Sequence, residues 1–345
     1  MEAQEILEKL INRTDLTKLQ STILAEIIFS EDVQASIKAA LLTALRMKGE
    51  SVSEILGFIE IIRKAMVKVK IDDLAIDTCG NGGDNQNTFN ISTAAAIVAA
   101  ACGVKVAKHG NRNISSKSGS ADVLEAMGAR VDLTAKEVED SLNFSNFTFM
   151  FVPNFHPIFK NIGLLRRELR IKTIFNLLGP LVNPAGVKRQ IIGSGSREAA
   201  EILSKVVQRL DNEHILVVHS FEGMDEISIY EPTQVFEIRG NRIKKFVIKP
   251  EEFGLRGKDA NNIRVNSIEE SKVKLTEILE GSFGDARKIV LFNSAAALYV
   301  GGRCRSIAEG IKFAEKAIDE GLAYAELNKF IEFSKKVRMQ NDQHI

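Results

Sequence analysis

Apolar residues recur at helical spacing along the first seventy residues of the chain. Residues three or four positions apart lie on one face of a helix, so such spacing predicts amphipathic helices. Two stripes of this kind are Ile6, Leu7, Leu10 and Ile11, and Ile37, Leu41, Leu42 and Leu45. The sequence SVSE at residues 51–54 is a capping box that starts a helix through Ile62, and Gly49 ends the helix before it. We therefore expect an all-helical domain over residues 1–71.

After residue 72 the pattern alternates between short apolar runs and helical segments. A capping box at residues 134–137 starts one of these helices. The expected strands cover residues 74–78, 104–107, 129–132, 147–151, 190–193 and 215–219. Such alternation predicts an α/β fold with a mainly parallel sheet covered by helices on both faces.

The remaining segments extend this α/β domain to residues 72–345. Residues 227–248 are rich in β-branched residues and predict antiparallel hairpins near a sheet edge, and helical patterns return from Ser267. Pro180 and Pro184 mark a crossover between the domains. We expect part of residues 157–185 to join the helical domain.

Composition and charge place the chain among globular proteins. Its 345 residues are 45% hydrophobic and carry a formal net charge of +1, which gives no electrostatic reason to expect nucleic acid or a membrane as partner. Cys79, Cys102 and Cys304 share no metal-ligand spacing and predict free thiols. The charged amphipathic start MEAQEILEKL does not resemble a signal peptide, and no apolar run reaches membrane length. We therefore expect a cytoplasmic protein.

A glycine-rich loop, DTCGNGGD at residues 77–84, follows the first predicted strand. Gly80, Gly82 and Gly83 allow positive φ angles and a close approach to a ligand. The next helix is expected to begin near Ser92 and Thr93, so that its free amide groups point toward the loop and favour phosphate. The loop has neither the ending of a P-loop nor GxGxxG spacing, so by itself it leaves a plain strand-to-helix turn open.

Polar side chains gather at the end of the next predicted strand. The sequence KHGNR at residues 108–112 supplies four polar side chains within five residues, and a small polar loop follows at residues 118–120. Ligands of open α/β sheets bind at the carboxyl ends of the strands. Each residue taken singly has an ordinary structural explanation, but together they predict a binding site.

These segments and three others resemble the anthranilate phosphoribosyltransferase family. The six matching motifs stand in the family's order, and the resemblance covers at least residues 40–226. They are DTCGNGGD (77–84), NIST (90–93), KHGNR (108–112), KSGSAD (117–122), KTIFNLLGPLVNP (172–184) and GMDE (223–226).

The sequence departs from the family pattern at three positions. Asn81 replaces a threonine of the glycine loop, while Arg170 and Lys172 replace the glycine and the arginine that precede the IFN segment. Asparagine keeps a hydrogen-bonding side chain and tolerates left-handed geometry, so we expect the loop to persist. A glycine at position 170 would permit an unusual backbone angle.

The resemblance implies a site for phosphoribosyl pyrophosphate and Mg²⁺ in the cleft between the two domains. Lys108 would stabilise the charge of the departing pyrophosphate, and Asp225 and Glu226 would bind Mg²⁺ with an oxygen of Ser92. Hard oxygen ligands beside a pyrophosphate suit this ion. Phosphoribosyl pyrophosphate is the phosphoribosyl donor, called the donor below. Its implied contacts are Gly80, Asn81, Gly82, Gly83, Asp84, Thr88, Asn90, Ser92, Thr93, Lys108, Ser118, Gly119 and Ser120.

The resemblance also implies a site for anthranilate. Arg166 would bind the carboxylate through its planar fork. The other implied contacts are Gly80, His109, Gly110, Asn111, Gly179 and Pro180, while His156 matches the family pattern without an assigned role. The amine of anthranilate would displace pyrophosphate from C1 of the ribose, and we assign no general base because an aniline nitrogen already presents a lone pair.

Two other functions stay open at this point. A pyrimidine nucleoside phosphorylase shares the fold and a glycine loop, although KHGNR and GPLVNP favour the transferase. A non-enzymatic paralogue that binds nucleic acid would show a basic face, whereas this chain has balanced charge and keeps Asp225 and Glu226. Members of the fold are commonly homodimers through the helical domain, and we expect the same here.

Overall fold

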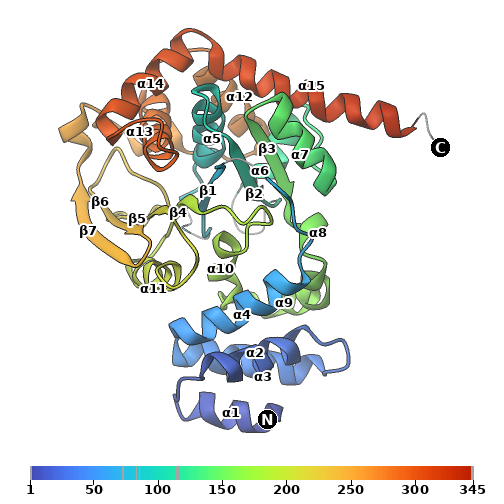
Figure 1. Cartoon of the computed structure of the whole chain (residues 1–345). Helices are drawn as coiled ribbons and strands as arrows, with labels where there is room; N and C mark the ends of the chain where they lie inside the picture. The colour runs from blue at the N-terminus through green and yellow to red at the C-terminus, as the bar shows by residue number, and fades with distance from the viewer. Residues whose placement is uncertain (1, 72–73, 83, 85, 113–116, 343–345) are drawn as a thin grey trace.

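Four helices form the end of the molecule that carries the N-terminus (Figure 1). The computed structural model describes residues 2–71, 74–82, 84, 86–112 and 117–342. The four helices are α1 (Ala3–Ile11), α2 (Lys18–Phe29), α3 (Ala35–Lys48) and α4 (Val52–Ala65). Ser51 and Glu54 form the expected capping box of α4, and Gly49 ends α3 with a φ of 90°. The expected helical domain is thus confirmed.

A seven-stranded sheet forms the centre of the larger part of the molecule, with the strand order β3-β2-β1-β4-β5-β6-β7. Strands β1 to β5 pair in parallel, whereas β6 and β7 form an antiparallel hairpin at the edge, as expected. The strands are β1 (Ile76–Gly80), β2 (Val106–Gly110), β3 (Phe147–Phe151), β4 (Arg189–Gly193), β5 (His214–Ser220), β6 (Thr233–Arg239) and β7 (Arg242–Ile248). On β7, Lys244 and Lys245 are exposed.

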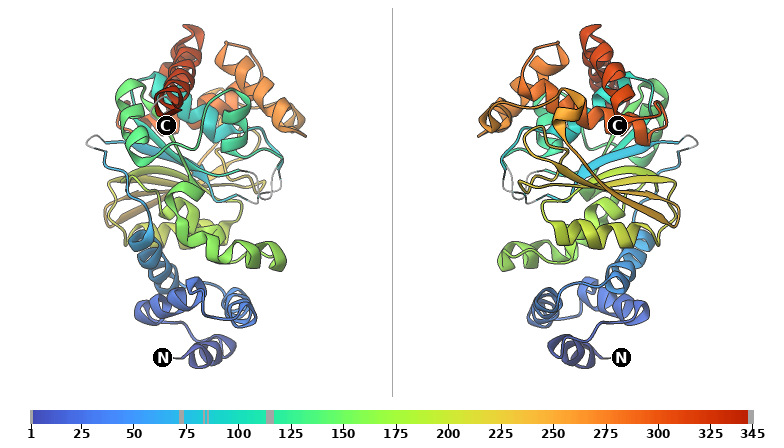
Figure 2. Two further views of the ribbon diagram at one scale, coloured as in Figure 1. Left: turned by 90° about the vertical axis from the view of Figure 1, so that its right-hand side faces the viewer. Right: turned by 90° about the vertical axis from the view of Figure 1, so that its left-hand side faces the viewer.

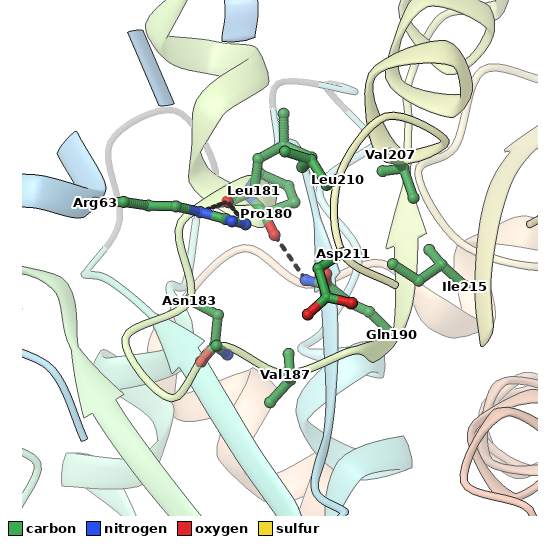
Figure 3. A pocket seen from close by; sticks show the side chains of 11 residues that line it. Arg63, Pro180, Leu181, Asn183, Val187, Gln190, Val207, Leu210, Asp211 and Ile215 are labelled. Atoms are coloured by element: carbon green, nitrogen blue, oxygen red, sulfur yellow. Dashed lines mark hydrogen bonds between the residues drawn. The ribbon is translucent and has the colours of Figure 1, made fainter. Parts of the chain in front are cut away.

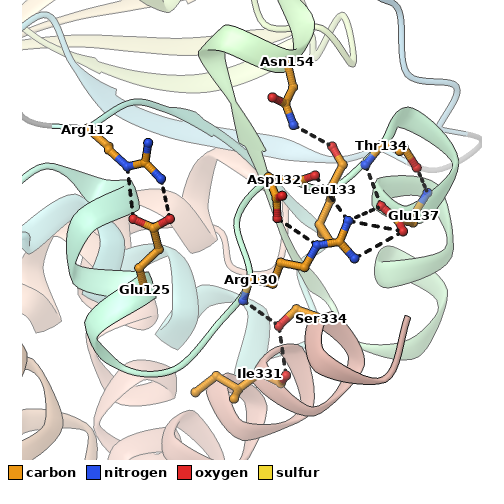
Figure 4. A network of polar contacts seen from close by, with 10 residues as sticks. All are labelled: Arg112, Glu125, Arg130, Asp132, Leu133, Thr134, Glu137, Asn154, Ile331 and Ser334. Carbon is orange, nitrogen blue, oxygen red and sulfur yellow. Dashed lines mark hydrogen bonds and ion pairs between the residues drawn. The ribbon is translucent and has the colours of Figure 1, made fainter. Parts of the chain in front are cut away.

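The prediction of a strand at residues 129–132 is wrong. This segment is irregular, and side chains rather than a neighbouring strand hold it (Figure 4). The Arg130 amide donates to Ser334 Oγ at 3.0 Å, and its guanidinium pairs with Asp132 at 2.7 Å and with Glu137 at 3.2 Å. The short alternating pattern therefore reflects a buried loop whose polar groups have other partners.

Helices cover both faces of the sheet, as expected (Figure 2). On one face lie α5, α13 and α15, and on the other lies α11. Side chains of β5 alternate between two hydrophobic cores, with Leu216 and Val218 in one and Val217 in the other. No helix of the described residues is long and apolar enough to cross a membrane. The helices after α4 are α5 (Ile91–Ala101), α6 (Ser120–Ala126), α7 (Ala135–Phe144), α8 (Val152–Phe155), α9 (Gly163–Leu169), α10 (Phe175–Leu178), α11 (Arg197–Val207), α12 (Ile268–Leu279), α13 (Asp285–Val300), α14 (Ile307–Asp319) and α15 (Leu322–Asp342).

Short 3₁₀ helices complete the described part of the fold, and two of them lie in the segment that connects β3 to β4. They are η1 (Pro157–Ile162), η2 (Gly179–Leu181), η3 (Pro250–Phe253) and η4 (Ala260–Ile263). Phe159 of η1 and Phe175 of α10 pack against Phe29 of α2, with ring centroids 5.9 and 5.7 Å apart. This aromatic contact attaches the connecting segment to the N-terminal helices.

Candidate active site

The carboxyl ends of the parallel strands meet at one edge of the sheet, where the chain changes direction between β1 and β4. From β1 the chain adds β2 and β3 on one side, and it then returns to place β4 on the other side. Gly80 at the end of β1 pairs with Gly193 at the end of β4. Such a switch point is where open α/β sheets form a ligand-binding crevice. The glycine loop begins here.

A turn that carries Asp225 and Glu226 lies directly over this switch point. A methyl group at Gly80 would collide with Asp225 Oδ2, and one at Gly193 would collide with the Asp225 carbonyl. The Gly82 amide donates to Asp225 Oδ2 at 2.9 Å. The two glycines therefore permit the acidic turn and the glycine loop to approach closely. Gly83, also expected at this site, lies outside the described residues.

Three carboxyl groups converge beneath this turn. Burial and then the charge of Asp84 raise the pKa of Asp225 to about 7. Burial and then Asp225 raise the pKa of Glu226 well above its usual range, which the Ser92 amide and Lys108 oppose. One buried oxygen of Asp84, Oδ2, has no hydrogen-bond partner among the described residues. Burial and mutual repulsion therefore disfavour the charged forms of Asp225 and Glu226, and a nearby cation would favour them.

Lys108 on β2 connects the acidic group to the start of α5. Its side chain is buried, and Nζ donates to the Thr78 carbonyl and, at 3.2 Å, to Ser92 Oγ. Ser92 stands in the first turn of α5, whose free amide groups favour anions. The structure thus brings a fixed cation and a helix N-terminus to the same place, as the sequence predicted.

Asn90 connects three segments that are far apart in the sequence. Its Oδ1 accepts from Ser118 Oγ at 2.8 Å and from Ser271 Oγ at 2.7 Å, while its Nδ2 donates to the Ser118 carbonyl at 3.1 Å. Ser118 belongs to the expected donor loop, with Gly119 and Ser120 after it. Ser271, on α12, was missed because one serine in a polar helix has no distinguishing pattern.

Thr93 and Thr88, two other expected contacts of phosphoribosyl pyrophosphate, have different neighbours in the structure. Thr93, in the first turn of α5, is buried, and its Oγ1 has no hydrogen-bond partner within the part of the chain that the structure describes. Thr88 forms an isolated antiparallel bridge with Arg264. Both belong to the connection between β1 and α5, and Thr93 offers a free polar atom here.

The Asn81 side chain points toward the loop that follows strand β4. Its Nδ2 donates to Ser194 Oγ at 3.4 Å, and its Oδ1 accepts from the Gly195 amide at 3.4 Å. Its backbone amide donates to the Gly193 carbonyl at 2.9 Å. The replacement of threonine is therefore accommodated by contacts between two loops.

Two buried histidines, His109 on β2 and His156 before η1, lie against each other. The rings of His109 and His156 lie 4.9 Å apart, and His109 Nε2 and both ring nitrogens of His156 have no hydrogen-bond partner among the residues described. Burial, then His156, lowers the pKa of His109 well below its usual value, and the Gly179 backbone beside it acts in the opposite direction. Burial lowers the pKa of His156 to about 4. Both rings are therefore neutral near pH 7.

Arg166 on α9 is half-buried and has no acidic partner among the described residues. Its guanidinium lies over the Phe175 ring at 5.3 Å, and burial lowers its pKa. An unpaired, partly desolvated guanidinium favours a carboxylate ligand. At the end of the same helix, Arg170 adopts a left-handed backbone with φ 51° and ψ 24°. The unusual angle expected from the family glycine is present here with an arginine.

A pocket opens behind the Gly179–Leu181 turn (Figure 3). It lies between Arg63 of α4, Pro180 and Leu181 of the Gly179–Leu181 turn, Val207 at the end of α11, and Asp211 in the turn that follows that helix. Pro180 is the expected site residue that lines it. This pocket is therefore distinct from the crevice at the strand ends.

No group of three or more His, Cys, Asp and Glu side chains in the described ranges is arranged to enclose a metal ion. Mg²⁺ uses few protein carboxylates and keeps water and substrate phosphates as ligands. Asp225, Glu226 and Ser92 therefore fit this ion better than an ion that requires a complete protein cage.

Comparisons with known proteins agree with this geometry. The family models described as glycosyl transferase family, a/b domain, and glycosyl transferase family, helical bundle domain, match residues 72–324 and 4–66. An anthranilate phosphoribosyltransferase of Nitrosomonas eutropha is 40% identical over 98% of this chain and 99% of that protein. The anthranilate phosphoribosyltransferase structure from Thermus thermophilus has a TM-score of 0.89 and 32% identity, covering 96% of this chain and 99% of that chain. The Saccharomyces cerevisiae structure in complex with PRPP and Mg has a TM-score of 0.88 and 26% identity, covering 97% and 98% of the two chains.

Proposed function

This chain belongs to the anthranilate phosphoribosyltransferase family, and from that membership we propose how its cleft holds the two substrates. It transfers the phosphoribosyl group of phosphoribosyl pyrophosphate to the amine of anthranilate, giving N-(5-phosphoribosyl)anthranilate and pyrophosphate in tryptophan biosynthesis. The observation that carries the site assignment is the convergence of Lys108, the Ser92 end of α5 and the acidic turn at the switch point.

The donor binds at the strand ends. Gly80, Gly82 and Gly83 let its phosphates approach the backbone, and the start of α5 directs Ser92 and Thr93 toward them. Lys108 supplies a fixed positive charge against the pyrophosphate. Asn90 keeps Ser118 and its loop beside the donor. The remaining expected contacts are Asn81, Asp84, Thr88, Gly119 and Ser120.

Asp225 and Glu226, with an oxygen of Ser92, bind Mg²⁺. The raised pKa values of the two carboxyl groups support this, since burial and mutual repulsion disfavour their charges when no cation is near. When bound, Mg²⁺ neutralises the charge that develops on the pyrophosphate. Mg²⁺ uses few protein ligands, so phosphate oxygens of the substrate and water would supply the others.

Anthranilate binds on the opposite wall. Arg166 holds its carboxylate, while His109, Gly110 and Asn111 contact the ring and amine. Gly179 and Pro180 line the entry, and Gly80 lies between the two substrates. A neutral His109 suits this place because it does not repel the positive charge that develops on the attacking nitrogen.

The reaction breaks the bond between C1 of the ribose and the pyrophosphate oxygen, which leaves with the electron pair. The amine nitrogen forms the new bond to C1 and then loses a proton to water. Lys108 and the loop amides are fixed before the reaction, so they stabilise the departing charge without reorganising. No residue is assigned as a general base.

We also propose the arrangement of the chain and its surroundings. Residues 1–71, with part of 157–185, form the helical domain, because Phe159 and Phe175 pack on α2. Residues 72–345 form the phosphoribosyl-binding domain.

Two molecules associate through the helical domain, where Ile11 and Met47 are 60% and 77% exposed. A cytoplasmic location agrees with the three free cysteines.

An anthranilate fluorescence assay tests the function. We expect the signal to fall only when phosphoribosyl pyrophosphate and Mg²⁺ are both present, with one pyrophosphate released for each anthranilate consumed. Phosphorolysis of uridine without anthranilate consumption would instead show a nucleoside phosphorylase.

A further inference from the structure

Two side chains hold consecutive carbonyls of the Gly179–Leu181 turn, and they come from different parts of the molecule (Figure 3). Arg63 of helix α4 donates from Nε and Nη2 to the Leu181 carbonyl at 3.2 and 2.8 Å. Gln190 of strand β4 donates from Nε2 to the Pro180 carbonyl at 2.9 Å. The turn is therefore tied both to the N-terminal helices and to the central sheet.

A pocket lies behind the Gly179–Leu181 turn, so the hydrogen bonds from Arg63 and Gln190 are an important part of its support. The pocket lies between part of the turn and Val207 of α11, with Leu210 in the turn after that helix, so a gap remains there although Leu181 and Val207 belong to the same hydrophobic core. Burial lowers the pKa of Arg63, and the charge of Asp211 opposes this effect. Arg63 forms no ion pair among the described residues, and its fork is directed at the Leu181 carbonyl instead.

Gln190 contacts Asp77, and Asp77 in turn contacts the backbone of His109. Gln190 Nε2 also lies 3.4 Å from Asp77 Oδ2, and Asn183 Nδ2 donates to the same oxygen at 2.8 Å. Asp77 is fully buried on β1, and its Oδ1 accepts from the His109 amide at 3.3 Å. Asp77 thus links the support of the turn to the backbone of His109.

We propose that Arg63 and Gln190 are positioning residues that set the distance between the Gly179–Pro180 wall and His109, and thereby the fit of the aromatic acceptor. This inference rests on the proposed placement of anthranilate against Gly179 and Pro180. Among the described residues, neither contacts a side chain assigned to phosphoribosyl pyrophosphate, and the approach of Gln190 to that site ends at Cys79 Sγ, to which its Nε2 donates at 3.2 Å. Loss of either hydrogen bond lets the turn shift, which weakens the acceptor and leaves phosphoribosyl pyrophosphate in place.

Steady-state kinetics of the full-length enzyme test this inference. Arg63→Met and Gln190→Met keep much of the side-chain volume and remove the donors, and each is expected to raise the KM for anthranilate by about tenfold. The KM for phosphoribosyl pyrophosphate is expected to stay within about twofold of wild type, a change below about 0.5 kcal/mol. Arg63→Lys keeps a charged donor and is expected to recover most of the loss. Lys64→Met, on the exposed side of the same helix, is the matched control and should resemble wild type.

Equal increases in both KM values would overturn the proposal, because they would indicate general damage. A wild-type KM for anthranilate in both methionine variants would also overturn it, as would an Arg63→Lys variant as impaired as Arg63→Met. If Arg63→Met fails to fold, Gln190→Met tests the same turn from the sheet side. Arg166→Ala, assayed in parallel, distinguishes failure of the acceptor site from failure of the positioning role. If the KM for anthranilate rises in Arg166→Ala but not in the Arg63 and Gln190 variants, only the positioning role is rejected. If it does not rise in Arg166→Ala, the proposed acceptor site is rejected.

Discussion

At the scale of single residues, the sequence indicated which segments lie together, since several of the motifs lie directly after strands. Lys108 and Ser92 meet because helix α5 follows β1 and begins at the sheet edge where neighbouring β2 ends. Asp77, Gln190 and Ser271 were not assigned roles, because they act through other protein groups and their types are common in any sequence. Their importance appears only when the fold brings distant segments together.

The acidic turn leads to the first prediction. The Asp225→Asn/Glu226→Gln variant should lose nearly all Mg²⁺-dependent turnover. It should fold at least as stably as wild type without Mg²⁺, because burial and mutual repulsion already disfavour the charged forms of both carboxyl groups and the amides remove that penalty. Thermal unfolding with and without Mg²⁺ and phosphoribosyl pyrophosphate measures this, since a ligand that binds the native state raises the melting temperature. The control is Glu251→Gln/Glu252→Gln, which changes two exposed glutamates that are adjacent in the sequence. Wild-type activity in the Asp225→Asn/Glu226→Gln variant would remove the metal assignment.

Arg166 leads to the second prediction. Arg166→Ala should raise the KM for anthranilate by roughly 30- to 150-fold, because a charged hydrogen bond in a partly desolvated site contributes about 2–3 kcal/mol. The KM for phosphoribosyl pyrophosphate should change little. The exposed neighbour Arg167 provides the control, as Arg167→Ala. Comparable damage to both constants would instead indicate a structural role for Arg166.

Asn81 leads to the third prediction. Because its side chain contacts Ser194 and Gly195, Asn81→Thr should keep the KM for phosphoribosyl pyrophosphate within roughly tenfold, or about 1.4 kcal/mol. Kinetics with the donor varied at saturating anthranilate measure this. A change of about a hundredfold or more would show that the Asn81 side chain contacts the donor directly.

At the scale of elements, the existence of the strands was predicted better than their bounds: the strands expected at 74–78 and 104–107 begin two residues later, at Ile76 and Val106. The strand at Phe147–Phe151 has the expected bounds, because all five of its residues are buried in the sheet. The segment at 129–132 alternates apolar and polar residues, but it forms no strand, and Arg130 pairs with Asp132 and Glu137. Local sequence does not reveal whether backbone groups pair with a strand or with side chains.

The C-terminal end of α9 leads to the fourth prediction. Arg170 holds a left-handed conformation that glycine adopts with less strain, so Arg170→Gly should raise the free energy of unfolding by about 1 kcal/mol. Arg167→Gly, inside the same helix, should lower it by about 1 kcal/mol. Urea denaturation of both variants measures the difference. A loss of stability in Arg170→Gly would mean that the arginine side chain contributes more than the backbone strain costs.

At the scale of the whole molecule, the exposed apolar side chains of α1 and α3 lead to the fifth prediction. If two copies associate through the helical domain, Ile11→Lys/Met47→Lys should convert the dimer to a monomer, because it places charges in the interface. Light scattering after size-exclusion chromatography measures the mass. Val273→Lys on α12, which is 48% exposed in the wild type, should leave the mass unchanged. A wild-type protein that runs as a monomer would contradict the proposed assembly.

The lysines of strand β7 affect how readily two molecules associate through their sheet edges at high protein concentration. An edge strand presents unpaired backbone groups to which a strand of another molecule can add. Lys244 and Lys245 place charge along this edge, and desolvating that charge opposes the addition of a further strand. Addition of an eighth strand from another molecule at the β7 edge of the seven-stranded sheet is therefore disfavoured.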